Sequence, residues 1–450
     1  MKDYINRISI NFILYLGLIF SPQLILGQIL SDNCNGSILP EIDLGLSENF
    51  DRNALSIESI RLPYPVLTYP ADSNEIYVIG GQPFSLDLFV NNILTGNSGV
   101  FNLPYYNLFD PYIVKIDPLT LDTMYLDISG GAGIPYVGGV VAHPNGFIYA
   151  IAEARLFKIN PANMSIDNFV DLPLPNPVSI YNGVSVASNG NLITKSFILN
   201  DYTDGDFLMI NPDNLQTIDQ LNAEIGTARI NFACDSVGNE YIYHINQNFT
   251  FRVQITIDSL IMDSSWQASY RPYGSANDTE PTSPRMLNNH VFYTTNTTPN
   301  ATKAMKIFWQ DRNLTYDVNS DTLESFFMFS DTVSSGFSFF GLTTDEETGI
   351  IIGLDQSNGK IAAYRIDSTN QLVYLWERSY GISSIPAIES NTGLVYLNDF
   401  DQTANVDYIV ILDLFDGIEL GRVITQGTVP SISNFVAGAY NDVYYCSNET

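Results

Sequence analysis

The chain has 450 residues, of which 45% are apolar and 12% aromatic, and its formal net charge is -30. Its content of aromatic residues, Gly, Asn, Asp and Ser favours strands and turns over helices, so we expect an all-β protein. So large an excess of carboxylates repels phosphate backbones and anionic lipid, and we therefore expect no nucleic-acid partner.

Residues 1–27 have the composition of a secretory signal peptide. Lys2 and Arg7 precede an apolar run from Ile8 to Phe20, and a polar segment follows Gly27. A retained N-terminal anchor is the alternative. No later run of about 18 apolar residues occurs. The mature chain, residues 28–450, is therefore expected to contain no membrane span and to be secreted, either to the cell exterior or to a periplasm.

Eight predicted hairpins follow along the chain. Each combines a short apolar run, a turn rich in Asn, Asp or Gly, and an apolar and aromatic run, as in "VLTYPADSNEIYVIGG" from Val66 and "GGVVAHPNGFIYAIAE" from Gly138. Successive turns are 44 to 72 residues apart. The turn residues of the eight copies are Asn74, Gly146, Gly190, Gly238, Asn289, Gly349, Gly393 and Asn441.

A second hairpin follows the first in five of these repeats, as in "LFKINPANMSIDN" from Leu156. Four strands in a period of roughly 50 residues are typical of a β-propeller blade, and such blades stack around an axis because none buries both of its faces alone. We predict a single propeller of four-stranded antiparallel blades. The residues expected to close the second turn by bonding their own backbone, rather than to bind a ligand, are Asp117, Asn160, Asn211, Asp367 and Asp413.

The eighth repeat, which begins near Pro430, stops after its first hairpin. We expect residues 29–60 to supply its missing outer strands, so that the N- and C-terminal segments together close a ring of eight blades. A seven-bladed ring with a terminal extension is the alternative. The eight-bladed closure would place Cys34 near Cys446 and allow a disulfide, with Cys234 left over; three unpaired cysteines are the other possibility.

Residues 82–110, "QPFSLDLFVNNILTGNSGVFNLPYYNLFD", form a long aromatic insertion in the first complete blade. Insertions of this size in a propeller lie at a face, where they cover the axis or meet a partner. A loop that packs on its own blade is the alternative.

The hairpin repeats resemble those of gluconolactonase, strictosidine-synthase-like and NHL-repeat propellers, while "YIVILDLFDGIELGR" and "YRIDSTNQLVYLWERSYG" are similar to quinoprotein-type repeats. Gluconolactonase-like enzymes hold a divalent cation in the central channel with a Glu, an Asn before Gly, and an Asp. The resemblance implies Asn182, followed by Gly183, as a candidate Ca²⁺ ligand. The Glu element has no match here, and Ile230 or Asn231 stands where the Asp is expected.

Other catalytic patterns are missing from the sequence. No two cysteines adjoin, as the quinoprotein comparison would require, and no GxSxG or HExxH motif occurs. We expect the three Trp residues to pack within blades, His143 to make a surface or inter-blade hydrogen bond, and the carboxylates of Asp399, Asp401 and 345–347 to be solvated charges. The three Trp residues are Trp266, Trp309 and Trp376, and the other two histidines of the chain are His244 and His290.

These observations favour a secreted propeller that binds a protein or a glycan, with no catalytic residue and no cofactor recognised. The alternative is a cation-dependent hydrolase of the lactonase or esterase type, with its site in the central channel near Asn182.

Overall fold

The computed structural model describes the strands between 41 and 102 and most of the chain from 111 to 447. The described segments before residue 111 are 41–42, 66–70, 76–80, 85–92 and 97–102. Beyond residue 111 the gaps in the description are 118–119, 121, 132–136, 175–178, 199–204, 224–230, 246–248, 270–283, 295–305, 318–322, 330–339, 357, 368–370, 383, 391, 426, 428, 430–434 and 438–441.

The described strands pair into eight antiparallel sheets. Sheet 1 contains β1 (Glu41–Ile42), β2 (Val66–Pro70), β3 (Ile76–Gly80), β6 (Tyr112–Ile116) and β7 (Thr123–Asp127). Sheet 2 contains β8 (Val137–Ala142), β9 (Ile148–Ala152), β10 (Arg155–Asn160) and β11 (Ser165–Asp171). Sheet 3 contains β12 (Ser179–Val186), β13 (Leu192–Ile198), β14 (Gly205–Ile210) and β15 (Thr217–Ala223). Sheet 4 contains β16 (Asn231–Cys234), β17 (Glu240–Ile245), β18 (Phe249–Ile255), β19 (Leu260–Met262) and β20 (Ala268–Ser269).

The remaining sheets continue in chain order until the last. Sheet 5 contains β21 (Arg285–Leu287), β22 (His290–Thr294), β23 (Lys306–Asp311) and β24 (Glu324–Phe327). Sheet 6 contains β25 (Phe340–Asp345), β26 (Ile350–Asp355), β27 (Lys360–Ile366) and β28 (Leu372–Ser379). Sheet 7 contains β29 (Ala387–Glu389), β30 (Leu394–Asp401), β31 (Val406–Asp413) and β32 (Glu419–Ile424). Sheet 8 contains β33 (Val436–Ala437), β34 (Asp442–Ser447), β4 (Ser85–Asn92) and β5 (Asn97–Asn102).

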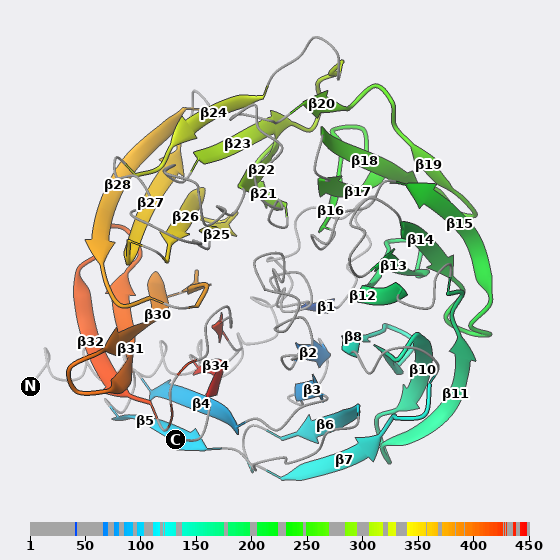
Figure 1. The fold of residues 1–450 in the computed structure, drawn as a ribbon, viewed down its shortest axis with the longest axis horizontal. Coiled ribbons are helices and arrows are strands. Elements are labelled where there is room, and N and C mark those ends of the chain that lie inside the picture. Colours follow the sequence, from blue (N-terminus) through cyan, green and yellow to red (C-terminus); the bar gives the residue numbers. More distant parts are fainter. Residues whose placement is uncertain are drawn as a thin grey trace, which may run out of the picture.

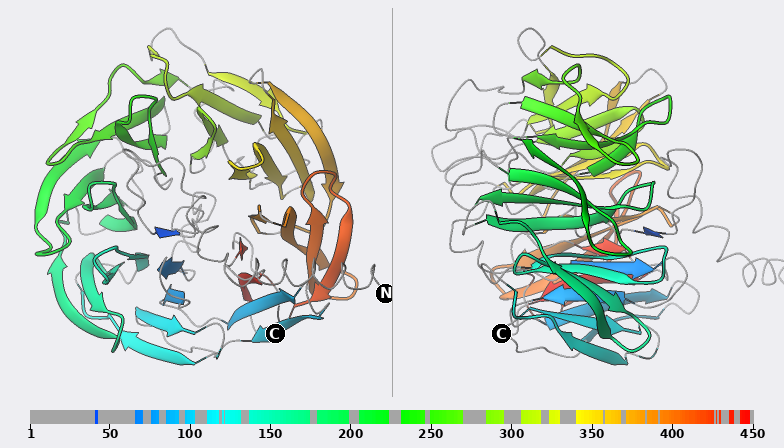
Figure 2. Two further views of the ribbon diagram at one scale, coloured as in Figure 1. Left: turned by 180° about the vertical axis from the view of Figure 1, so that it is seen from behind. Right: turned by 90° about the vertical axis from the view of Figure 1, so that its right-hand side faces the viewer.

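The sheets are arranged in a ring around one axis (Figure 1), and seen edge-on the strands run across the thickness of a disc (Figure 2). This arrangement is a β-propeller, so the all-β fold predicted from the sequence is confirmed. All eight predicted hairpins are present as antiparallel pairs. Their turns need residues that accept a left-handed backbone, and Gly146 and Gly190 provide it with φ of 85° and 83°.

The core lies between neighbouring sheets, because successive residues of a strand point to opposite faces. In β13, Leu192 packs in the cluster shared with sheet 2, whereas Ile193 packs in the cluster shared with sheet 4. In β26, Ile351 faces sheet 5 and its neighbours Ile350 and Ile352 face sheet 7. Each of these sheets is therefore buried by the sheets on either side, as the repeat argument requires.

The closing sheet differs from the sequence-based expectation. β34 pairs with β4 from Ser85 to Val90, and β5 forms the outer edge. The outer strands of this sheet thus come from residues 85–102, inside the predicted insertion 82–110, and not from residues 29–60. Apart from β1, which pairs with β2, residues 29–60 lie outside the described residues. The predicted insertion is therefore, in its paired parts, a structural component of the ring.

No helix among the described residues has the length and apolar character needed to cross a bilayer.

Candidate binding surface

The predicted turn-forming residues accept backbone hydrogen bonds, as expected. Each side-chain oxygen lies close to a backbone nitrogen within the same turn, which satisfies a donor that the turn leaves without a strand partner. The predicted turn-forming role of these residues is confirmed. The pairs, with the accepting side chain first and the donating backbone nitrogen second, are Asp117 and Thr120 at 3.2 Å, Asn160 and Ala162 at 2.9 Å, Asn211 and Asp213 at 2.8 Å, Asp367 and Gln371 at 3.0 Å, and Asp413 and Phe415 at 2.8 Å.

The histidines take structural positions. His143 Nδ1 accepts from the backbone of Asn145 at 3.0 Å, so Nε2 carries the proton and donates to the Gly190 carbonyl of the next sheet at 2.9 Å. The predicted inter-blade role of His143 is confirmed. His244 and His290 are buried within β17 and β22.

The indoles of the tryptophans also pack within and between sheets. Trp266 donates to the Asp311 carbonyl at 3.0 Å and Trp376 donates to the Leu414 carbonyl at 2.9 Å. Trp309 is partly buried against the aromatic rings of its own sheet. The prediction that these rings serve packing is confirmed.

Two carboxylates that were expected to be solvated accept hydrogen bonds within the protein. Asp345 is 7% exposed and accepts from the Ser390 hydroxyl of the next sheet at 2.6 Å. Asp399 accepts from the Gly381 backbone at 2.6 Å and from Arg422 at 3.0 Å. The prediction is therefore wrong for Asp345, which is buried, whereas Asp399 keeps 19% of its side chain exposed and is bonded rather than freely solvated. The donors Ser390, Gly381 and Arg422 lie too far along the sequence to be seen in the local pattern.

Two other carboxylates, one partly buried and one buried, have perturbed pKa values. Burial raises the pKa of Glu240, and its oxygens accept from Ser188 at 2.8 to 3.0 Å. Burial also raises the pKa of Asp407, which accepts from Asn398 Nδ2 at 3.0 Å and from the Val429 backbone at 2.8 Å. Perturbed carboxylates can mark active sites, but these oxygens are committed to hydrogen bonds that hold segments together.

The candidate Ca²⁺ ligand Asn182 lies in the innermost strand of sheet 3. The strand bulges between Tyr181 and Val184, and Gly183, with a φ of 96°, has a carbonyl that accepts from Thr194 Oγ1 at 2.6 Å. The Asn182 side chain itself lies outside the described residues. Among the residues that the structure describes, no three His, Cys, Asp or Glu side chains gather closely enough to hold a metal ion.

The cysteines do not pair as expected. Cys234, which was predicted to be left over, is disulfide-bonded. Because the chain has three cysteines, a bond at Cys234 excludes the predicted bond between Cys34 and Cys446. The side chains of Cys34 and Cys446 lie outside the described residues.

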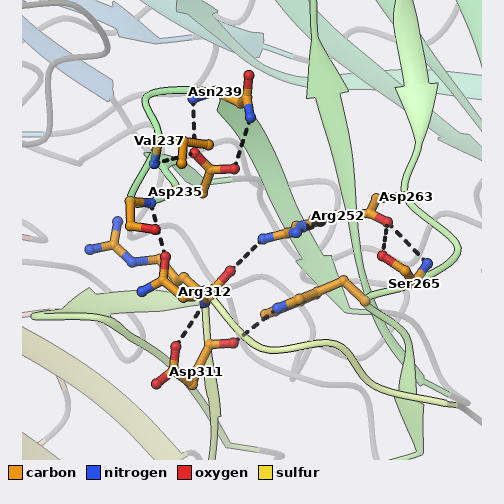
Figure 3. A network of polar contacts seen from close by, with 11 residues as sticks. Asp235, Val237, Asn239, Arg252, Asp263, Ser265, Asp311 and Arg312 are labelled. Atoms are coloured by element: carbon orange, nitrogen blue, oxygen red, sulfur yellow. Dashed lines mark hydrogen bonds and ion pairs between the residues drawn. The ribbon is translucent and has the colours of Figure 1, made fainter.

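A polar network joins sheets 4 and 5 (Figure 3). Arg252 on β18 bonds Asp263 at 2.8 Å through both Nε and Nη2, and its Nη1 donates to the Arg312 carbonyl at 2.6 Å. Arg312 in turn donates to the Cys234 carbonyl at 3.2 Å. Burial alone would raise the pKa of Asp263, but hydrogen bonds from Ser265 and Arg252 outweigh it and the pKa lies below its ordinary value. This network fixes the geometry between two sheets.

Exposed apolar side chains occur on the outer strands of sheets 5, 6 and 7 and in the turn that leads to the outer strand of sheet 7, and these sheets follow one another around the ring (Figure 1). We call this surface the outer apolar arc, and its members are 45% to 57% exposed. It holds 7 of the 15 exposed large apolar residues among those that the structure describes. The members are Phe327, Val373, Tyr374, Phe415, Ile418, Leu420 and Ile424.

The sheets that carry the arc are bonded to one another. The Tyr364 hydroxyl donates to the Met328 carbonyl at 2.9 Å and connects sheets 5 and 6. Arg378 on β28 donates to the Gly417 carbonyl at 2.8 Å and connects sheets 6 and 7. Gly417 has a φ of 66°, and a Cβ there would lie 2.6 Å from the Trp376 ring, so this turn needs glycine to dock against β28.

Sequence reasoning did not identify the arc. In β28, Val373 and Tyr374 are both exposed although they are adjacent, because the strand is the outermost of its sheet. The strict alternation that marks a half-buried strand is therefore lost there.

The fold is similar to that of several solved propellers. One is the β-propeller domain of Cps50 (Swd1) from Myceliophteria thermophila, with 10% identity, 71% of this chain and 98% of that chain covered, and a TM-score of 0.42. Another is a putative 6-phosphogluconolactonase from Bacteroides fragilis, with 10% identity, coverage of 76% and 95%, and a TM-score of 0.40. A third is BamB from Moraxella catarrhalis, with 10% identity, 69% of this chain and 96% of that chain covered, and a TM-score of 0.38. No protein-family model and no curated protein matches the chain.

Proposed function

We propose that this protein is an exported propeller of eight blades, one for each sheet, that binds a protein partner through the outer apolar arc. The observation that carries the proposal is the group of exposed apolar side chains on the outer strands of three neighbouring sheets and in the turn before the last of these strands. Apolar patches that stay in contact with water mark interaction surfaces more often than isolated exposed residues do.

The chemistry of the surface favours a protein with an apolar patch and a basic border. Most cationic side chains among the described residues bond within the molecule, as Arg155 does to Asp171 and Arg285 to the Leu342 carbonyl. The net charge of -30 means that carboxylates are in large excess over cationic side chains. A partner with Lys or Arg around its contact patch would be steered towards this surface.

A glycan is the second class of partner. Phe327 and Tyr374 expose aromatic rings on which a sugar face could stack, but the other arc members apart from Phe415 are aliphatic. Aliphatic side chains contribute apolar area and no directed contact to hydroxyl groups, so the composition of the arc favours a protein.

Export is supported by two features. Residues 1–27 have the pattern of a signal peptide, and Cys234 is disulfide-bonded, which is typical of proteins in oxidising compartments. The cation-dependent hydrolase with Asn182 as a ligand stays a prediction from the sequence.

The binding proposal is tested with a double variant, Tyr374→Ser with Leu420→Ser. Partners are captured from the exported proteins of the producing organism and identified by mass spectrometry. Each purified partner is then titrated against the unmodified protein and against the double variant. A glycan array is probed with the same two proteins in parallel. We expect the variant to bind the protein partner at least about tenfold more weakly, because buried aromatic and aliphatic anchors carry most interface energy.

The matched control is Val237→Ser with Ile257→Ser, which removes two side chains that are 79% and 80% exposed in turns of sheet 4. This variant should bind as the unmodified protein does. Equal affinities for the arc variant and the control would refute the proposal, and array binding that the arc variant abolishes would identify a glycan instead.

A further inference from the structure

The interface between sheets 4 and 5 contains two buried tyrosine hydroxyls. Tyr243 on β17 and Tyr293 on β22 belong to the same apolar cluster, and both are 0% exposed. Neither hydroxyl has a hydrogen-bond partner of normal geometry among the residues that the structure describes. Tyr149, which is equally buried, instead donates to the Pro212 carbonyl of the next sheet at 2.8 Å. Tyr243 and Tyr293 therefore need a different partner.

The amide of Gln310, in the same interface, is bonded at only one of its two atoms. Gln310 on β23 is 1% exposed, and its Oε1 accepts from the Thr250 hydroxyl of sheet 4 at 2.6 Å. Its Nε2 carries two N–H donors and has no partner within the described part of the chain. Three buried polar groups of one interface are thus left to be satisfied.

The strand register places these groups on facing surfaces. In sheet 5, Val291 pairs with Gln310 and Tyr293 pairs with Phe308. Residues two apart on a strand share a face, so Tyr293 and Gln310 project from the face whose members Val291 and Phe308 pack in the cluster of Tyr243. Tyr293 and Gln310 are diagonal neighbours on that face, with Cα atoms about 7–8 Å apart, so their long side chains can reach one small molecule.

The hydroxyls of this interface stay neutral and keep their protons. Burial raises the pKa of Tyr243 to about 12, and the nearby Arg252 guanidinium only partly offsets it. Burial also raises the pKa of Tyr293, and Tyr243 is the next contributor, so the two groups lie within electrostatic range of each other. Arg252 directs bonds to Asp263 and to the Arg312 carbonyl (Figure 3). Each tyrosine proton therefore still requires an acceptor.

The chemistry of these groups selects the molecule that they bind. Buried hydroxyls and amides are costly unless they are hydrogen-bonded, so the three groups favour an occupant that forms hydrogen bonds. Water is neutral and small, both donates and accepts, and makes about three hydrogen bonds at interior sites. A halide ion would only accept, and it would bring a further negative charge into the core of a protein with a net charge of -30.

We propose that an internal water molecule lies between sheets 4 and 5, bonded by the hydroxyls of Tyr243 and Tyr293 and by the amide nitrogen of Gln310. This water links the two sheets in addition to the direct bond between Thr250 and Gln310. The proposal does not depend on the outer apolar arc, since it uses only buried groups.

A crystal structure of the purified protein, at a resolution that shows ordered water, tests the site directly. We expect density for one oxygen atom within about 3.2 Å of both Tyr293 Oη and Gln310 Nε2. A dry interface, or hydroxyls that bond directly to protein groups, would overturn the proposal. An anomalous peak at this position in crystals grown in sodium bromide would also overturn it, because the occupant would then be a halide.

The variant Tyr293→Phe provides a second readout, because it removes one hydroxyl and keeps the ring. Loss of a bonded hydroxyl destabilises a protein, whereas loss of a buried and unbonded one does not. We expect the Tm to fall by roughly 1–3 °C, as measured by calorimetry. The matched control is Tyr149→Phe, which loses a direct bond to the Pro212 carbonyl and should also lower the Tm. A Tm for Tyr293→Phe equal to or above that of the unmodified protein would contradict the proposal.

Discussion

Some of the described arginine side chains join neighbouring sheets. Arg252 of sheet 4 donates to the carbonyl of Arg312, the residue directly after β23 of sheet 5. Arg378 of sheet 6 donates to the carbonyl of Gly417 in the turn between β31 and β32 of sheet 7. A guanidinium suits this task because it offers five donors in a rigid fork and stays charged when buried. Each arginine therefore needs a carboxylate or several carbonyls around it.

The pair of Arg252 and Asp263 provides a test at this scale. In Asp263→Asn an amide donor would face the buried guanidinium, which would lose its counter-charge. We expect the free energy of unfolding at pH 7 to fall by about 2–4 kcal/mol. Urea denaturation measures the loss.

The effect of Asp263→Asn should depend on pH. The pKa of Asp263 is lowered in the folded protein, so the stability it provides is present above its unfolded pKa and is lost as the pH falls through the folded pKa. The difference between the two proteins should therefore shrink towards pH 3. Asp213→Asn, in an exposed turn, is the control and should change stability by less than about 0.5 kcal/mol. An equal loss at pH 7 and pH 3 would contradict this account.

Residue roles could be predicted where the contact is local. Asn160 and Asp413 close turns with residues two positions away, so their roles follow from the turn sequence. Asp345 depends on Ser390, 45 residues later, and Cys234 depends on a cysteine elsewhere in the chain. Such contacts exist only once the ring has formed, and no local pattern indicates them.

Strands show the same division between local and distant pairing. The eight first hairpins were predictable because a tight turn joins strands that pair with each other. The pairing of β34 with β4 joins segments more than 300 residues apart, and the sequence of residues 85–102 reads equally well as a surface insertion. The closing pair therefore had to be observed.

Closure of the ring by this distant pair can be tested with Tyr445→Ala. Tyr445 in β34 is 1% exposed and stacks on Phe435 at 5.3 Å. Removing the ring should cost about 3–5 kcal/mol. Hydrogen exchange should increase in residues 85–102 as well as in 442–447, since β4 loses the order of its partner strand.

The control for the closing sheet is Phe327→Ala on the outer strand β24, where the side chain is 54% exposed. It should leave exchange in residues 85–102 unchanged. If Tyr445→Ala raised exchange in 442–447 alone, the outer strands of sheet 8 would be held by something other than β34.

At the scale of the whole molecule, the ring has two kinds of surface with different relations to the chain. Inside the ring, β1 pairs with the innermost strand β2, so part of the protein's own chain lies there. The outer apolar arc has no covering segment among the described residues. A partner can therefore reach the arc without displacing any described strand.

The net charge of -30 should make the stability of the whole ring depend on salt. The excess carboxylates repel one another, and this repulsion acts over about 30 Å at 0.01 M salt but only about 8 Å at 0.15 M. The few ion pairs are short, at 2.6 to 3.8 Å, and are screened less. We expect the Tm at pH 7 to rise by roughly 1–3 °C between these NaCl concentrations, as measured by calorimetry. At pH 4.1, near the sequence pI, the repulsion disappears and only attractive pairs are left to screen, so the rise should vanish or reverse. A Tm that falls with salt at pH 7 would mean that the carboxylates are paired far more completely than the described ion pairs indicate.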